Sequence, residues 1–526
     1  MNAWLARNAL TVVRRKPAAY SIWLAVAVLV FTLSGCVVGP KYHPPVTQAP
    51  VVYKESPTQF KESEGWQVAQ PADAQLRGKW WEIFNDPELN ALEEQLDINN
   101  QNIKQYFENY MEARALVREA RSQYFPTISV GPSVTHGSAS TNPSSTSNSS
   151  TSGASSGSSS RSQVSASLYT LPLDASWEPD LWGKVRNTVH ENQYAAQVSA
   201  AELENERLTE EASLAEFFFE IRGQDQLQEI FDETVVADQK ALDLTRALYE
   251  TGIDDQISVV EAETTLQTVQ AGATNVGIAR AQYEHAIAVL LGKAPSNFSI
   301  PVKPMTVAPP PIPVGIPSQL LERRPDVAAA ERTMAEANAA IGIAYAAYYP
   351  NLSLTGGAGL ESTSISNWFA WPARFWSVGA SLSETIYDGG LRRATVQQYV
   401  ATYNADLAAY RQTVLTAFQQ VEDGLAEVRI LSKETQQQQQ AVTSSQTYLK
   451  LEEARYETGI DPYVNVLIAQ TTLLSNQQTL NSLQVQQMAY AVALVEALGG
   501  GWDRSQLPTP QQVTRKPPQS QTAIQQ

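Results

Sequence analysis

Cysteine is the residue type this sequence has least of, because Cys36 is the only one among 526 residues. A single cysteine excludes an intramolecular disulfide, a cysteine-ligated metal cluster and a thiol redox pair. Cys36 therefore acts alone, either as a small buried hydrophobic residue or as a point of chemical attachment.

Histidine is also scarce, with only four copies in the chain. His43, His136, His190 and His285 are isolated in the sequence, and none has a second histidine or a cysteine at metal-ligand spacing. The sequence contains no nucleophile elbow and no phosphate-binding loop. We therefore expect no enzyme activity, no metal site and no cofactor.

Positive charge and long apolar runs are limited as well. The chain has 37 basic and 54 acidic residues, a net charge of −17, which argues against nucleic acid as a partner. After residue 33 no segment approaches the roughly 20 apolar residues that a membrane helix needs. If this part of the chain crosses a membrane, it must do so as β-strands.

The first 35 residues have the layout of a secretory signal peptide. Arg14, Arg15 and Lys16 precede an uncharged apolar run over 18–33, and small residues follow. The segment Leu33-Ser34-Gly35-Cys36 resembles the bacterial lipobox, in which the cysteine is lipidated and becomes the new N-terminus. Removal of 1–35 takes away four basic residues and no acidic one, so the net charge falls to −21. A plain signal peptide and an uncleaved anchor helix are the alternatives.

The chain repeats one plan twice. Tyr249 to Asp254 (YETGID) recurs 207 residues later as Tyr456 to Asp461, and the same offset places Gly183 over Gly390. Further upstream, "SQYFPTISV" at Ser122 pairs with "AAYYPNLSL" at Ala346. The first copy is longer because it contains a serine-rich segment, 138–162, which is too polar to pack and is expected to be a solvated loop.

Each copy contains an apolar alternation typical of a two-stranded hairpin, about 126–177 in the first copy and about 350–387 in the second. In the first copy the apolar phase shifts near Thr170, which suggests a β-bulge there. An ordinary soluble hairpin would explain either one alone, but two equivalent hairpins favour membrane strands. An aromatic cluster suits a membrane interface: Trp368, Phe369, Trp371, Phe375 and Trp376.

A very long helical stretch follows each hairpin, and no proline interrupts it before the repeated turn. Its apolar residues recur every three or four positions as a narrow coiled-coil seam. Each stretch turns at Gly252 or Gly459, in keeping with a left-handed helix C-cap. A second helix then returns over about 258–291 or 464–498.

These features divide the chain into six segments, which are expected to be a signal peptide (1–35), a lipid-anchored tether (36–78), a first repeat (79–300), a proline-rich linker (301–317), a second repeat (318–503) and a disordered polar tail (504–526). Four strands in one chain cannot close a barrel, and open sheet edges are not tolerated in lipid. A membrane interpretation therefore requires several chains that together form a conduit.

The chain resembles the TolC-like outer-membrane factors, in the lipoprotein (NodT-type) branch that serves tripartite efflux pumps. The matching segments cover almost the whole mature chain, and include "WWEIFNDPELNALEEQLDINN" from Trp80, "IPSQLLERRPDVAAAE" from Ile316 and both Tyr-Glu-Thr-Gly turns. The resemblance implies an α+β fold in a homotrimer, with a 12-stranded transmembrane β-barrel, a mixed equatorial region and a long periplasmic α-helical barrel. The Leu-Glu-Arg-Arg-Pro-Asp segment also has a purely structural interpretation, because Pro325 is suited to open a helix with acidic residues in its first turns.

The function implied is that of a passive exit duct in the outer membrane, anchored by lipid and extending into the periplasm. Its implied partners are a periplasmic adaptor and an inner-membrane transporter of the RND type, and its cargo is small molecules such as drugs. A conduit for type I protein secretion and a structural envelope-spanning lipoprotein remain the alternatives. The family's adaptors dock at the turns, which are Gly252 and Gly459 here.

The family closes its periplasmic aperture with carboxylates six and nine residues after the second turn glycine. Here those positions hold Asn465 and Ile468, so the constriction is expected to be more apolar and less cation-selective than usual. The carboxylates nearby complete the candidate set: Asp461, Glu457, Asp254, Asp255 and Glu261.

Overall fold

The computed structural model of the chain describes residues 37–45, 49–50, 52–55, 78–139, 164–305, 309–312 and 321–515. The predicted signal peptide, Cys36 and the larger part of the serine-rich segment lie outside these ranges. The chain divides into two compact units, which we describe separately. The first comprises 1–42, 118–191 and 338–401, and the second comprises 43–117, 192–337 and 402–526.

Helices make up most of the described chain, and α3, α4, α7 and α8 contribute residues to both units. Within the described ranges, none of the helices is both long and apolar enough to span a membrane. The longer helices are α2 (Pro87–Asn99), α3 (Gln101–Ser122), α4 (Lys184–Glu250), α5 (Gln256–Leu290), α7 (Pro325–Ala346), α8 (Leu391–Glu457) and α9 (Tyr463–Ala497). The short ones are η3 (Trp80–Phe84), η4 (Pro295–Asn297), η5 (Ile365–Asn367), η6 (Trp371–Ala373), η7 (Arg504–Gln506) and α10 (Pro510–Thr514).

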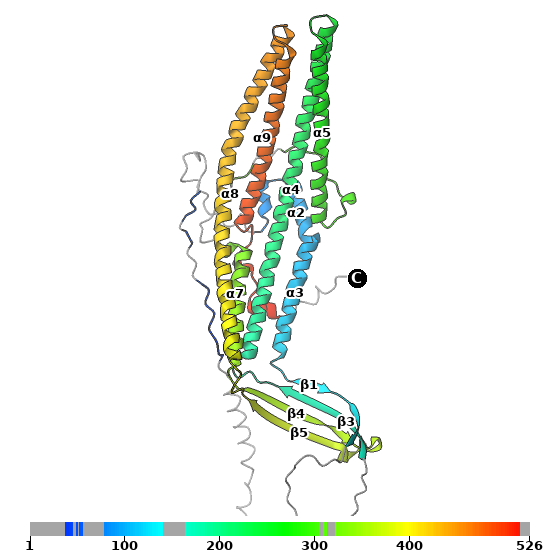
Figure 1. Ribbon diagram of the computed structural model, residues 1–526, viewed down its shortest axis with the longest axis vertical. Helices are drawn as coiled ribbons and strands as arrows, with labels where there is room; N and C mark the ends of the chain where they lie inside the picture. Colours follow the sequence, from blue (N-terminus) through cyan, green and yellow to red (C-terminus); the bar gives the residue numbers. More distant parts are fainter. Residues whose placement is uncertain are drawn as a thin grey trace, which may run out of the picture. The chain divides into compact units, whose positions relative to one another are not determined.

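The first unit contains a single antiparallel sheet (Figure 1). Its strands are β1 (Thr127–Val130), β2 (Ser133–Ala139), β3 (Val164–Trp177), β4 (Asn351–Ser362) and β5 (Arg374–Ser383). The order is β1-β3-β4-β5, and β2 also pairs with β3. β1 and β2 are two pieces of one strand, separated at Gly131 and Pro132, because proline has no N–H to donate to the ladder.

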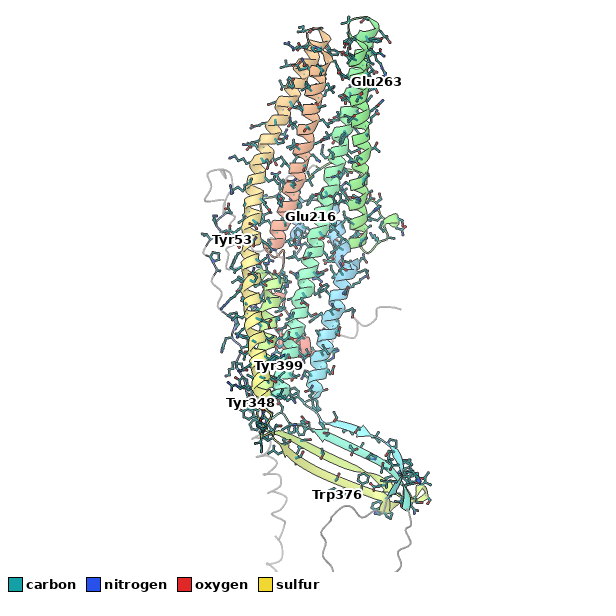
Figure 2. The ribbon with its side chains drawn as sticks, in the orientation of Figure 1. Tyr53, Glu216, Glu263, Tyr348, Trp376 and Tyr399 are labelled. Carbon is teal, nitrogen blue, oxygen red and sulfur yellow. The ribbon has the colours of Figure 1, made fainter. Side chains whose placement is uncertain are left out.

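Over 173–177 of β3 and the segments paired with it, the register gives this sheet one apolar and one polar face. Residues paired directly across strands have side chains on the same face. One such row joins Val130, Leu173, Ala358 and Trp376, and another joins Ile128, Ala175, Gly356 and Val378. The row between them, on the opposite face, is Ser129, Asp174, Gly357 and Ser377. The apolar side chains are nonetheless exposed in the single chain, with Trp376 at 79% and Val378 at 81%. Figure 2 labels Trp376 on the sheet.

The β-bulge expected near Thr170 is absent from β3, so that prediction was wrong. Thr127 pairs with Ser176 and Ala139 pairs with Val164 in one unbroken register, and the pairing of β3 with β4 is equally regular. The apolar residues therefore change face along β3 instead of being realigned by an extra residue. A phase shift in hydrophobicity cannot distinguish these two causes, since both move apolar side chains by one position.

The aromatic cluster gathers around the connection between β4 and β5. The rings of Trp368 and Phe369 lie 5.2 Å apart, and the ring of Tyr169 lies 5.7 Å from that of Trp368. The Arg374 guanidinium lies 3.5 Å from the ring centre of Trp371. Phe369 and Trp371 are 72% and 75% exposed, so one end of the sheet carries a belt of exposed aromatic rings.

The two long helices begin in the same way, as their alignment in the sequence suggests. Gly183 and Gly390 both have positive φ, +82° and +93°, a conformation that glycine adopts without steric cost. The carboxylate of Asp180 accepts backbone N–H groups at the start of α4, and Asp388 does the same for α8. The capping aspartate is displaced by one residue between the copies, yet it pairs with an arginine of the first turns in each.

The second unit is dominated by two helical hairpins, α4 with α5 and α8 with α9 (Figure 1). Its main core lies where η3 and α2 pack against these hairpins. Asp86 caps α2 by accepting from the amides of Glu88 and Leu89, and Pro87 opens the helix. The fully buried side chains of this core include Trp80, Phe84, Leu89, Leu96, Phe218, Phe219, Ile287 and Met488.

Candidate functional site

The turn ends of the two helical hairpins hold most of the predicted functional residues, all in the second unit. At the first turn the Gly252 amide donates to Tyr249 and the Ile253 amide to Leu248, at 2.9 and 3.0 Å. The second turn repeats both bonds, from Gly459 and Ile460. This pair of bonds is the Schellman motif, which requires the positive φ that both glycines have, +77° and +70°.

One tyrosine joins the two hairpins close to these turns. The Tyr456 hydroxyl of α8 donates to Asp254 at 2.6 Å and lies 3.2 Å from the hydroxyl of Thr245 on α4. Asp254 also accepts from the Asp255 amide at 2.8 Å and from Ser258 at 2.9 Å. The first turn and the second hairpin are thus connected through a single carboxylate.

Charge strengthens this connection. Burial raises the pKa of Asp254, but the hydrogen bonds from Tyr456, the Asp255 amide and Ser258 outweigh it and hold the pKa below its ordinary value. Burial and the Asp254 hydrogen bond raise the pKa of the Tyr456 phenol. At neutral pH a neutral donor therefore meets an ionised acceptor, which makes a stronger hydrogen bond than two neutral groups do.

The second turn has an ion pair of its own. Arg455 of α8 contacts both oxygens of Asp461, one at 3.1 Å, and this hydrogen bonding lowers the pKa of Asp461. Arg455 is half-exposed, so the pair lies in a well-solvated position where ion pairs contribute little stability. Nearer the middle of the first hairpin, Arg246 of α4 pairs at 2.5 Å with Glu263 of α5, which Figure 2 labels.

An apolar seam continues between the hairpins behind these polar contacts. Tyr463 of α9 is 1% exposed, and its ring lies 5.4 Å from that of Tyr456. Leu242 of α4, Leu266 of α5 and Val466 of α9 are buried in the same cluster. Burial raises the pKa of Tyr463 to about 12, with smaller contributions from Asp238 and Glu261.

The remaining predicted aperture residues lie on or near the turns and differ in how far they are exposed. Glu457 and Asp255 are exposed, and Asp255 caps α5 by accepting from the Ser258 amide at 3.1 Å. Asn465 is half-buried, and Ile468 is 50% exposed. Their role at an aperture stays a prediction, because it depends on contacts with other copies of the chain.

Exposed isoleucines occupy the tips of both turns. Ile253 and Ile460 follow the two turn glycines and are 68% and 65% exposed, and Ile257 at the start of α5 is 66% exposed. The two turns thus carry large aliphatic side chains at equivalent exposed positions.

Sequence reasoning did not identify Tyr456, Thr245 or Arg455 as functional. The repeat contained a signal for Tyr456, since the hexapeptide starts with tyrosine in both copies. Only the structure distinguishes the two tyrosines, because Tyr249 is 45% exposed whereas Tyr456 is 6% exposed. The difference arises in the packing of one hairpin against the other, which no local pattern records.

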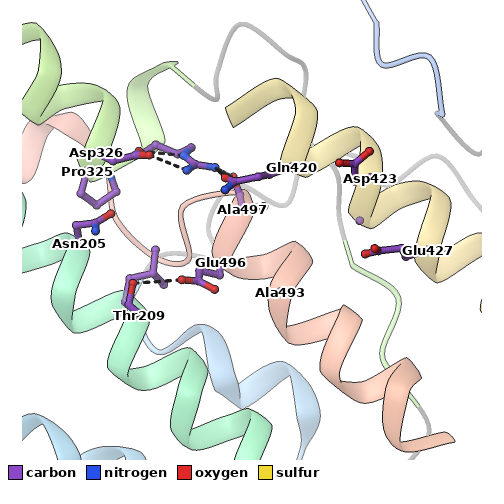
Figure 3. A pocket seen from close by; sticks show the side chains of 13 residues that line it. Asn205, Thr209, Pro325, Asp326, Gln420, Asp423, Glu427, Ala493, Glu496 and Ala497 are labelled. Atoms are coloured by element: carbon purple, nitrogen blue, oxygen red, sulfur yellow. Dashed lines mark hydrogen bonds and ion pairs between the residues drawn. The ribbon is translucent and has the colours of Figure 1, made fainter. Parts of the chain in front are cut away.

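A second polar site surrounds Arg324, in the segment that the resemblance singled out (Figure 3). Its guanidinium donates to both oxygens of Asp326 at 2.9 and 2.7 Å, to Gln420 of α8 at 2.7 Å and to the Ala497 carbonyl of α9 at 3.0 Å. A cavity of about 460 Å³ adjoins it. Arg324 is 9% exposed, so this site binds the start of α7 to the end of α9 and has a structural role.

Comparison with known proteins identifies the family. Residues 92–293 and 316–500 match the family model described as outer membrane efflux protein. The chain belongs to the outer membrane efflux protein family. Its long paired helices and two short hairpins are thus the architecture of the family's channels, and the family named from sequence motifs is confirmed.

Individual relatives in the efflux protein family support this assignment. The toluene efflux pump outer membrane protein TtgC of Pseudomonas putida is 30% identical over 481 residues, covering 91% of this chain and 95% of TtgC. Outer membrane protein OprJ of Pseudomonas aeruginosa is 30% identical, covering 93% and 97%. The structure of the outer-membrane channel OprN superposes with a TM-score of 0.78 at 27% identity, covering 89% of this chain and all of that one.

Proposed function

We propose that this efflux protein is the outer-membrane exit duct of a tripartite pump, through which small molecules pass passively from the periplasm to the exterior. The observation that carries this is the register of the sheet over 173–177 of β3 and the segments paired with it, where apolar side chains lie on one face and polar ones on the other across all four strand positions. Such a sheet suits a wall with lipid on one side and water on the other.

The pore forms from three chains. The sheet has two edges, one formed by β1 and β2 and the other by β5. Within the described residues, the outer side of each edge pairs with no other strand. Unpaired edges in lipid cost several kcal/mol for each unsatisfied group, so the edges of neighbouring chains pair and close a 12-stranded barrel. The exposed aromatic belt beside β5 lies at the membrane interface.

The resting channel is closed by the Tyr456–Asp254 connection at the turn ends. A periplasmic adaptor binds the protruding turns at Gly252 and Gly459, through Ile253 and Ile460, and an RND-type inner-membrane transporter supplies substrate and energy. Separation of the two hairpins opens the duct. Lipid attached at Cys36, which lies outside the described residues, anchors the chain in addition to the barrel.

Bilayer recording tests the proposal directly. The purified full-length protein, checked for a trimer by cross-linking, is incorporated into planar bilayers and compared with a Tyr456→Phe variant. We expect discrete conductance steps that are rare in the wild type and frequent in the variant. A protein that assembles but conducts in neither form would instead be a structural envelope lipoprotein.

A protein-secretion conduit is the second candidate, because the channel does not select the cargo. Deletion of the gene distinguishes the two. Loss of small-molecule resistance with unchanged protein secretion supports efflux. The name of the relative TtgC, a toluene efflux pump protein, and the description of the family both favour that outcome.

A further inference from the structure

Asp238 of α4 is a buried acid that the proposed closure does not use. It is 2% exposed, and both of its carboxylate oxygens are buried without a hydrogen-bond partner in the described part of the chain. It precedes Thr245 by seven residues, so it lies two turns, or about 10 Å, farther along α4 from the turn. A buried carboxylate without a partner is costly when it is ionised.

Among the described residues, no positive charge lowers the pKa of Asp238. Next to it along α4, Val235, Ala241 and Leu242 pack in the apolar seam with Tyr463 and Val466 of α9. The titratable groups on this seam are Tyr463 of α9, Tyr456 of α8 and, on α5, Glu261, which acts on Tyr463. None of these is a cation.

Of the cations nearby, Arg246 pairs with Glu263 and Arg455 with Asp461, and the side chain of Lys240 on α4 is exposed whereas Asp238 is buried. Burial alone raises the pKa of Asp238, to about 6 from its ordinary 3.8.

We propose that Asp238 is a proton-dependent lock between the two hairpins, and that its ionisation favours their separation. When the carboxyl is protonated, the seam buries a neutral group and the hairpins stay together. When it is ionised, burial of the charge costs free energy. Separation of the hairpins removes this cost, because water then hydrates the carboxylate. The consequence for conduction rests on the proposed function, because the same separation opens the duct.

The direction and size of the pH effect on hairpin separation follow from the difference in the pKa of Asp238 between the closed and open states. A pKa raised in the closed state stabilises that state fully at low pH, and this stabilisation is lost as pH rises through about 6. In the open, hydrated state the carboxyl returns to its ordinary value near 3.8. The open-to-closed ratio of each chain therefore rises about tenfold between pH 5 and pH 7.5.

Hydrogen exchange tests the lock without requiring a working channel. Amide protection of peptides covering 456–470 is measured on the full-length trimer at pH 5 and pH 7.5, corrected for intrinsic exchange rates. We expect about tenfold lower protection at pH 7.5 in the wild type and none of this change in Asp238→Asn. Asp243→Asn, an exposed neighbour on α4, is the matched control and should keep the wild-type pH dependence.

Asp238→Glu keeps a titrating carboxyl and should restore the pH dependence, which separates protonation from a packing defect. Equal pH dependence in the wild type and in Asp238→Asn overturns the lock. Bilayer conductance of the same proteins is then compared. If exchange depends on Asp238 but neither the wild type nor Tyr456→Phe conducts, the lock stands and the proposed channel function fails.

Discussion

At the scale of single residues, two identical hexapeptides acquire different roles through their neighbours. Tyr249 and Tyr456 both precede Glu-Thr-Gly, yet only Tyr456 reaches a carboxylate on the other hairpin. The bond joins two helical hairpins near their ends. A single hydroxyl is therefore well placed to influence whether the ends stay together.

Tyr456→Phe should loosen the turn ends. The variant keeps the ring in the seam but removes the donor to Asp254, an interaction with a charged group that is typically worth about 1.5–3 kcal/mol. We expect more frequent channel opening in bilayers and greater sensitivity of cells to large antibiotics. Tyr249→Phe, the equivalent change at the exposed copy, should leave both unchanged. Equal effects of the two substitutions would contradict a role for the Asp254 bond.

A pair of buried glutamates predicts how stability depends on pH. Glu93 of α2 is fully buried with both oxygens unpartnered among the described residues, and Glu211 of α4 accepts from the Trp80 indole at 2.7 Å. Burial raises the pKa of both, and that of Glu211 to about 8. The stability that protonated Glu211 contributes is therefore fully present below about 4.5 and is lost as pH rises through about 8, and Glu93 acts in the same direction.

The free energy of unfolding should thus fall by a few kcal/mol between pH 5 and pH 9. Thermal unfolding of the detergent-purified protein, followed by circular dichroism, measures this as a falling midpoint. Glu211→Gln should reduce the slope, whereas Glu457→Gln, at an exposed site, should not. A midpoint that rises with pH would show that these carboxyls are hydrated in the folded protein.

At the scale of elements, sequence patterns predicted the helices and turns, because local residue chemistry determines these elements. Apolar spacing and the lack of proline determine the long helices and the returning helices, and glycine allows the positive φ at the turns. All three signals can be read from the sequence. The expected return helices, about 258–291 and 464–498, compare with 256–290 and 463–497 in the structure.

What the patterns could not supply were contacts between distant segments. The continuous register of β3, the partners of Tyr456 and Arg324 and the burial of Asp238 depend on which segments meet in space. In each case the residue type was compatible with an exposed or a buried position, and tertiary packing decided between them.

The exposed isoleucines of the two turns allow a prediction about adaptor binding. Ile253 and Ile460 are exposed tips, 68% and 65% accessible, so Ile253→Glu with Ile460→Glu should leave folding intact. We expect lost efflux, measured as drug susceptibility, with unchanged abundance of the protein in the outer membrane. Ile253→Val with Ile460→Val keeps apolar tips and should retain efflux. Full resistance in the glutamate variant would exclude these tips as the adaptor contact.

At the scale of the whole molecule, the two faces of the sheet make the last prediction. Val378 belongs to the apolar face and Ser377, its neighbour on β5, to the polar face. A lysine facing lipid at mid-depth costs about 2–4 kcal/mol in membrane barrels, whereas one facing water costs little. Val378→Lys should therefore reduce outer-membrane insertion and trimer yield, while Ser377→Lys should assemble normally and change only the ion selectivity of the pore. Membrane fractionation with cross-linking measures the first effect, and bilayer recording measures the second. The reverse pattern would place lipid on the Ser377 face and would invert the proposed barrel.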